Sequence, residues 1–163
     1  MQSKNARGNG EYTSSEIASI IGWRYARNDQ REWPASVMMV KFGLTRNGAN
    51  GFWDELDVPV RRESRHVRTS GGPRLCNVFV LPSKWRWQLN GHKTHTKTGA
   101  FVIAEYLARQ KWATTTELAE MVGWNRKRTR QLVARISHYL PLVRYYRLGR
   151  DADSLWVSLD AMS

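Results

Sequence analysis

One short segment of this chain occurs twice, and that echo constrains the fold more than any other feature. Residues 13–23 read TSSEIASIIGW and residues 114–124 read TTTELAEMVGW, at an offset of 101 residues. In each copy a threonine stands three residues before a glutamate, which is the spacing of a capping box at a helix N-terminus. Aliphatic residues then fall on one helical face, and a glycine favours the end of the helix.

A short capped helix followed by a glycine turn is typical of the first half of a helix-turn-helix. Ordinary helix hairpins contain the same pattern, so a single copy would indicate little. Two copies, each in a basic segment, predict an α+β protein with two small helix-turn-helix-type domains in tandem. The expected division is a flexible N-terminus over 1–11, an α+β domain over 12–90, a linker over 91–98 and a second domain over 99–163.

The C-terminal half predicts three helices followed by a β-hairpin. Asn125 caps the third helix and Pro141 follows its end. The expected elements are helices over 100–109, 115–122 and 125–140, and strands over 143–148 and 154–159 around a turn at 149–153. Over residues 99–160 this order resembles the winged helix-turn-helix family. The resemblance implies a recognition helix in the DNA major groove, with the hairpin wing on adjacent backbone or in the minor groove.

The third predicted helix has a basic outer face. At 100° per residue, Lys127, Arg130 and Gln131 gather on the side opposite the apolar residues, and two further arginines flank them. Arginine can read guanine, and glutamine can read adenine, through paired hydrogen bonds. Residues 125–150 contain no acid. A solvated face usually mixes acids with bases, so this pattern favours contact with nucleic acid.

The N-terminal half, after the echo, predicts a helix, a loop and a second wing. Pro34 opens the helix, which ends at Gly43. The expected elements after it are a turn or loop over 47–51, a basic strand over 61–68, a tight turn over 70–73 and an apolar strand over 75–81. With the Leu81-Pro82 step, residues 12–90 resemble the DNA-binding domain of Mu-type phage repressors and transposases, which has a last helix after that step. The alternative is a small α+β domain that only packs against the other.

Charge indicates the partner. The chain has 26 Lys and Arg against 14 Asp and Glu, a net charge of +12, and basic proteins of this kind attract phosphates because binding releases counterions. We expect double-stranded DNA, since no aromatic strand motif of RNA-binding type is present. The predicted contacts are Asn125, Arg126, Lys127, Arg128, Arg130 and Gln131 on the third helix, Arg150 on the wing tip, Lys93 and Lys97 in the linker, and Arg61, Arg62, Arg65 and Arg68 on the basic strand.

Few residues indicate catalysis or a cofactor. The single cysteine, Cys76, excludes an intramolecular disulfide and is expected to be a small strand residue. The histidines of the linker have no cysteine or carboxylate near them in the sequence. A metal-dependent nuclease would need Asp54, Asp57 and His66 to converge. We therefore expect a protein that is not an enzyme and that has no cofactor and no metal.

The expected function is sequence-specific binding of double-stranded DNA, as a transcription regulator of a phage or mobile element. Tandem binding units without a sensor domain suit that role. Origin-binding replication initiators also carry paired winged helices and give the second interpretation. A winged helix used for protein contacts alone is the third, and the net charge argues against it. No apolar run approaches a membrane span and no signal-peptide core is present, so we expect a cytoplasmic, nucleoid-associated protein, with a homodimer left open.

Overall fold

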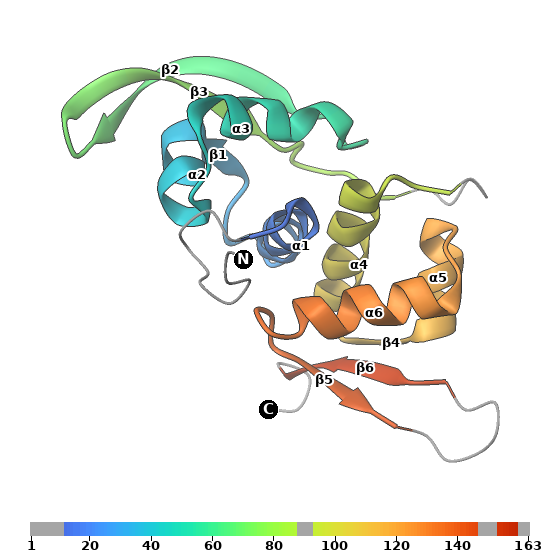
Figure 1. Ribbon diagram of the computed structural model, residues 1–163. Coiled ribbons are helices and arrows are strands. Elements are labelled where there is room, and N and C mark those ends of the chain that lie inside the picture. Colours follow the sequence, from blue (N-terminus) through green and yellow to red (C-terminus); the bar gives the residue numbers. More distant parts are fainter. Residues whose placement is uncertain (1–11, 88–92, 147–152, 160–163) are drawn as a thin grey trace, which may run out of the picture.

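The computed structural model describes residues 12–87, 93–146 and 153–159 and has an α+β architecture (Figure 1). These parts of the chain contain six α-helices and two three-stranded antiparallel sheets. The order helix, strand, helix, helix, strand, strand occurs twice along the chain. The arrangement is consistent with two small α+β units, which we call the N-terminal unit (12–87) and the C-terminal unit (93–159).

The N-terminal unit ends in a long β-hairpin. The unit consists of α1 (Ser14–Ala26), β1 (Glu32–Pro34), α2 (Ala35–Phe42), α3 (Arg46–Gly51), the 3-10 helix η1 (Phe52–Glu55), β2 (Arg61–Thr69) and β3 (Gly72–Val80). The strands are ordered β1-β3-β2, and β2 pairs with β3 along its whole length, from Arg61 opposite Val80 to Thr69 opposite Gly72. The tip of the hairpin projects past α2 (Figure 1). The predicted basic strand, tight turn and apolar strand are thus confirmed.

The C-terminal unit repeats this topology with a longer first helix. The unit consists of α4 (Thr96–Gln110), β4 (Trp112–Thr114), α5 (Thr115–Val122), α6 (Arg126–Ile136), β5 (Leu142–Tyr145) and β6 (Leu155–Ser158). The strands are ordered β4-β6-β5, so the last strand again lies in the middle. The three helices and two strands predicted here are confirmed, although α4 begins earlier and α6 ends earlier than expected.

The two units correspond at an offset of 80 residues. Gly43 and Gly123 end α2 and α5 in the left-handed conformation, with φ of 67° and 74°. Two residues later the next helix is capped by Thr45 in one unit and by Asn125 in the other. Each capping side chain accepts a hydrogen bond from the backbone N–H three residues ahead. The same turn therefore joins the second and third helices of both units.

The echo at 101 residues aligned two helices with different places in the fold. Both capping boxes are present, formed by Thr13 with Glu16 and by Thr114 with Glu117. Yet α1 is the first helix of its unit, whereas α5 is the second. The repeat argument built on this echo is therefore wrong, even though its local prediction of two capped helices is confirmed.

Three further expectations about local structure are wrong. The helix that begins after Thr13 does not stop at Gly22, because α1 continues to Ala26. Residues 46–51 form α3 and not a loop, and their N-cap is Thr45. No helix follows Pro82 in the part of this segment that the structure describes, residues 82–87.

Helices α1 and α4 pack against each other and join the two units. A Cβ atom on Gly22 would lie 2.4 Å from the carbonyl oxygen of Phe101, so the missing side chain lets the two backbones approach closely. The ring centroids of Tyr25 and Phe101 lie 6.0 Å apart in the same contact. Buried apolar residues of both units form one continuous core. Within the described residues no helix is long and apolar enough to span a membrane.

Candidate nucleic-acid interface

The start of α6 is fixed by its cap. Oδ1 of Asn125 accepts a hydrogen bond of 2.7 Å from the backbone N–H of Arg128. The buried Thr129 donates its hydroxyl proton to the carbonyl oxygen of Asn125 at 2.9 Å. An N-cap satisfies N–H groups that would otherwise have no partner in the first turn. The first turn of α6 is therefore held by its cap, and it presents Arg126 and Lys127 to solvent.

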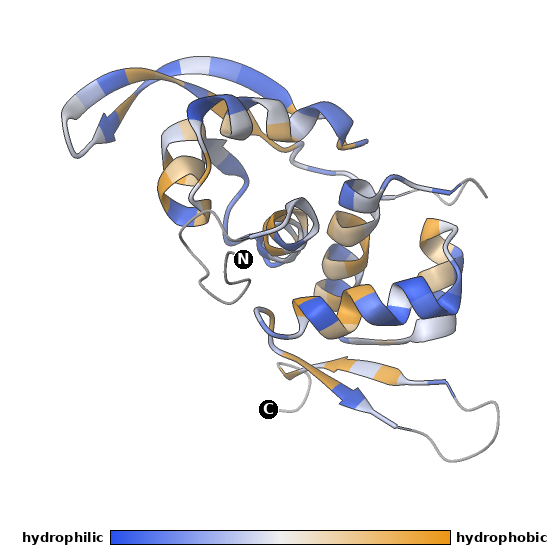
Figure 2. Ribbon diagram, in the orientation of Figure 1, coloured by the Kyte–Doolittle hydropathy of each residue, from blue (hydrophilic) through white to orange (hydrophobic). Residues whose placement is uncertain are grey.

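Helix α6 has one buried face and one hydrophilic face. Leu132, Val133 and Ile136 are buried in the core. Gln131 is exposed and Arg130 is half-buried on the other side. Figure 2 shows hydrophilic residues along the helix. The structure thus places Lys127, Arg130 and Gln131 on the face that the helical periodicity predicted, with the exposed Arg126 beside them.

Arg128 belongs to this helix but is directed toward the protein. Its guanidinium carbon lies 4.0 Å from the ring centroid of Trp124, which is a cation–π contact. Its Nη2 also donates to Oγ1 of Thr96 in the first turn of α4. Trp124 is itself held by a hydrogen bond of 3.1 Å from its Nε1 to the carbonyl oxygen of Thr94. Arg128, which flanks the outer face and is predicted to contact DNA, therefore packs against Trp124 and Thr96 in this structure.

The two lysines of the predicted linker lie in different environments. Lys93 is exposed. Lys97 belongs to α4 and is only 5% exposed; its Nζ donates to the carbonyl oxygen of Phe52 and lies 4.5 Å from the centre of that ring. Burial lowers the pKa of Lys97. This lysine ties α4 to η1. Its ammonium group lies against Phe52 and not in solvent, contrary to the prediction that it contacts DNA.

The acidic residues near η1 take part in the same junction between the units. Oε2 of Glu55 lies 3.3 Å from Nε2 of His95. The backbone N–H of Asp57 donates to Oγ1 of Thr98 at 2.9 Å. In the described parts of the chain no three His, Cys, Asp or Glu residues are grouped so that they could hold a metal ion. The nuclease interpretation, which needed Asp54 and Asp57 to meet His66, finds no support in this arrangement.

The arginines of β2 divide between its two faces. Arg65 forms ion pairs with Glu32 at 2.7 Å and with Glu63 at 2.6 Å, and Arg61 also contacts Glu63. The hydrogen bonds from Arg65 lower the pKa of both glutamates. Arg62 and Arg68 alternate with these residues along the strand and are exposed. Arg62 and Arg68 therefore remain candidates for phosphate contacts, whereas Arg61 and Arg65 already have carboxylate partners.

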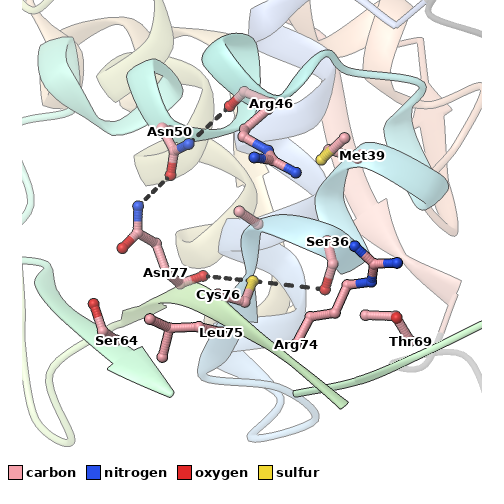
Figure 3. A pocket seen from close by; sticks show the side chains of 11 residues that line it. Ser36, Met39, Arg46, Asn50, Ser64, Thr69, Arg74, Leu75, Cys76 and Asn77 are labelled. Carbon is pink, nitrogen blue, oxygen red and sulfur yellow. Dashed lines mark hydrogen bonds between the residues drawn. The ribbon is translucent and has the colours of Figure 1, made fainter. Parts of the chain in front are cut away.

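The sequence prediction missed a basic group between α2, α3 and the hairpin. A hollow of about 250 Å³ lies there, and Arg46 of α3 and Arg74 of β3 are among its lining residues (Figure 3). Nδ2 of Asn77 donates to Oδ1 of Asn50 at 2.8 Å, which joins β3 to α3. Cys76 is a half-buried strand residue beside this hollow, as expected. The offset of 80 residues, which pairs Arg46 with Arg126, could have revealed this group.

The wing of the C-terminal unit is described in part. Arg150 lies outside the described residues. Asp153 accepts a hydrogen bond of 2.9 Å from the backbone N–H of Thr116 in the first turn of α5. Burial acts to raise the pKa of Asp153, but the hydrogen bonds from Thr116 and the nearby charge of Arg126 outweigh it, so the pKa lies below its usual range. This carboxylate therefore anchors the start of β6 to α5.

Comparison with known proteins adds no relative to this picture. A scan against protein-family models found no match, and searches of curated proteins and of solved structures found none either. The surface of this chain is therefore the basis for a proposed function. The strongest feature of that surface is the basic first turn and outer face of α6.

Proposed function

We propose that this protein binds double-stranded DNA through two winged helix-turn-helix units, with α6 as the recognition helix of the C-terminal unit. The observation that carries the proposal is the exposed face of α6, which begins at a capped turn and bears Arg126, Lys127, Arg130 and Gln131. The repeated order of elements supports it, because a second and third helix joined by a tight turn and followed by a hairpin is the layout of such units.

The residues of α6 divide into two roles under this proposal. Arg126 and Lys127 lie in the first turn and suit phosphate contacts, which position the helix without reading sequence. Arg130 and Gln131 lie one turn further along the face and carry the groups that can pair with base edges in the major groove. Arg128 supports them from behind through its contact with Trp124.

The N-terminal unit offers a smaller binding surface of the same kind. Helix α3 occupies the place of α6, and its exposed Arg46 and Asn47 correspond to Arg126 and Lys127. It spans six residues, two of them glycine, so it offers fewer side chains for base contacts. The adjoining hairpin of β2 and β3 supplies Arg62, Arg68 and Arg74 as phosphate contacts. We infer that this unit reads fewer base pairs than the C-terminal unit and draws more of its affinity from phosphate contacts.

A transcription regulator of a phage or mobile element is the biological role we propose first, because paired DNA-binding units suit that role. An origin-binding replication initiator is the second candidate. The shared core of the two units favours it, since an initiator must hold DNA in a fixed geometry while other proteins assemble. The first test is common to both roles.

That test begins with selection of a preferred duplex from a random pool and measurement of affinity by fluorescence anisotropy. Arg130→Ala and Gln131→Ala should each weaken binding to the selected duplex by about 1–3 kcal/mol and affect unrelated duplexes much less. Lys127→Ala should weaken binding to all duplexes alike. Lys84→Ala, an exposed lysine on a different segment, is the charge-matched control. Equal losses on selected and unrelated duplexes for Arg130 and Gln131 would contradict the assignment of α6 as the reading helix.

A further inference from the structure

A second basic hollow lies where the C-terminal ends of α1 and α4 meet. It has a volume of about 700 Å³. Four cationic side chains line it, together with Gln110 and two alanines, and no carboxylate is among the lining residues. The four are Arg27, Arg86, Arg109 and Lys111. We call this feature the rear hollow.

The cations of the rear hollow come from three segments of the chain. Arg27 and Lys111 are the C-cap residues of α1 and α4, where the helix dipole favours positive charge, and Arg27 also forms an ion pair with Asp29 at 3.4 Å. Arg109 lies in the last turn of α4, forms an ion pair with Glu105 and lies over the ring of Tyr25. Arg86 follows β3 and is exposed. Helix dipoles account for cations at two helix ends, but they do not account for Arg86 on the same hollow.

The rear hollow lies at the end of α4 opposite to the end that contacts the first turn of α6. Arg128 of α6 contacts Thr96 at the first turn of α4, whereas Lys111 follows the last turn of the same helix. Helix α4 has 15 residues, which at 1.5 Å per residue separates its two ends by about 22 Å. One turn of α4 therefore touches the proposed reading helix, and the opposite end of α4 borders the rear hollow.

The rear hollow also borders the end of the C-terminal sheet that lies opposite its hairpin turn, because Lys111 directly precedes β4. The backbone N–H of Leu81, just after β3, donates to the carbonyl oxygen of Arg31 at 2.9 Å. In the other unit the N–H of Ser158, the last residue of β6, donates to the carbonyl oxygen of Lys111 at 2.7 Å. Each bond closes the end of its sheet opposite the hairpin turn, and the second one involves Lys111, which lines the rear hollow. A duplex bound along α6 and the hairpins would therefore leave the rear hollow uncovered.

We propose that the rear hollow binds backbone phosphates of a second nucleic-acid segment, separate from the segment bound by α6. The proposal rests on the proposed function. Long flexible cations without a rigid set of base-reading groups suit phosphates, which any sequence offers. An open hollow of this size suits a polyanion that enters from solvent. One molecule would then hold two duplex segments together, or two parts of one bent duplex.

The test compares variants that change charge at the hollow with a matched change outside it. Arg86→Glu reverses an exposed charge. Lys111→Asn removes a charge and introduces a residue type that tolerates the positive φ of 76° at this position. Lys84→Glu reverses an exposed charge two residues from Arg86 but outside the lining. Each full-length variant is measured on a single 20-base-pair duplex that contains the selected sequence. Each variant is also tested for its ability to bring together two duplexes, one labelled with a donor dye and one with an acceptor dye, which is read as energy transfer between them.

The expected result separates the two measurements. Arg86→Glu and Lys111→Asn should change affinity for the single duplex less than about twofold and raise the protein concentration needed for pairing at least tenfold. Lys84→Glu should change the affinity for the single duplex and the concentration needed for pairing by less than about twofold each. An equal loss in both measurements would overturn the proposal, because the hollow would then belong to the α6 interface. Absence of pairing by the wild-type protein would overturn it as well.

A small phosphate compound is the competing ligand, and inorganic pyrophosphate serves as its probe. If calorimetry shows pyrophosphate binding that depends on Arg86 while duplex pairing does not, the hollow binds a small anion and the proposal is wrong. Failure of the proposed function looks different. In that case binding to the single duplex would be insensitive to Arg130→Ala and Gln131→Ala, whatever the hollow variants do.

Discussion

The role of Gly22 depends on both helices of the contact in which it lies, α1 and α4. From the sequence, a glycine that ends an apolar run indicates a helix stop, and the identical position in the second copy, Gly123, does stop its helix. The structure continues α1 past Gly22 because the carbonyl oxygen of Phe101 occupies the space of a side chain. A pattern within one segment cannot show a contact with a residue almost 80 positions away. The capping boxes at Thr13 and Thr114 were predictable because all their atoms are local.

Gly22→Ala should lower the free energy of unfolding by about 1–3 kcal/mol, because its Cβ atom would force apart two packed backbones. Gly51→Ala is the matched control, since its Cβ atom would meet nothing closer than Oδ2 of Asp54 at 3.7 Å. A glycine in a helix costs stability relative to alanine, so this control should be neutral or stabilising by up to about 1 kcal/mol. Denaturant unfolding measures both. Equal effects from the two substitutions would show that the α1–α4 approach is not tight.

The lowered pKa of Asp153 makes a prediction about acid stability. A carboxyl group whose pKa is lower in the folded state stabilises the fold above its unfolded-state pKa, near 3.9, and this contribution is lost as pH falls through the lower folded value. The difference in unfolding free energy between wild type and Asp153→Asn should therefore be constant above about pH 5 and shrink below about pH 4. Urea unfolding across pH 2–7 measures it. A difference that stays constant to pH 2 would mean that the hydrogen bond from Thr116 does not depend on charge.

At the scale of elements, periodicity predicted the helices and strands whose patterns are strong. It missed α3, whose composition favours a turn. Residues 46–51 contain two glycines and two asparagines, which favour turns. They form α3 because Thr45 caps it and because Ala49 and the following Phe52 are buried in the core. Tertiary packing thus outweighs local propensity. The matching turn at Gly43 and Thr45 was present in the sequence, but the stronger echo at 101 residues obscured it.

The cap of α6 should affect stability and DNA binding together. Asn125→Ala removes the acceptor for the N–H of Arg128 and should cost about 1 kcal/mol of stability. Fraying of the first turn should also weaken duplex binding, because Arg126 and Lys127 lose their fixed positions. Asn125→Ser keeps a capping oxygen and should restore most of both losses. Thermal unfolding and anisotropy on the same samples measure them. Full binding by Asn125→Ala despite lower stability would show that the first turn does not contact DNA.

For the whole molecule, the sequence indicated two basic units and the structure joins them through α1 and α4. A linker over 91–98 implied independent units, but residues 96–98 form the first turn of α4, and Lys97 and Thr98 are buried against the N-terminal unit. The sequence does contain one indication that α4 is covered on more than one side. Residues 100–104 are five consecutive apolar residues, and a helix that is apolar all round is covered on more than one side. The partner that covers the second side, α1, could not be identified from that pattern.

A shared core predicts how the chain responds to the spacing of its DNA site. If both units bind one duplex, the rigid contact at Gly22 and Phe101 holds α3 and α6 at a fixed separation and rotation. Five extra base pairs between the two halves of the selected site turn one half by about 180° and shift it by about 17 Å, so affinity should fall to that of α6 alone. Ten extra base pairs restore the rotation but shift the half-site by about 34 Å, so affinity should stay low. Flexibly joined units would instead recover much of the lost affinity at ten base pairs, and anisotropy on the three duplexes distinguishes the two outcomes.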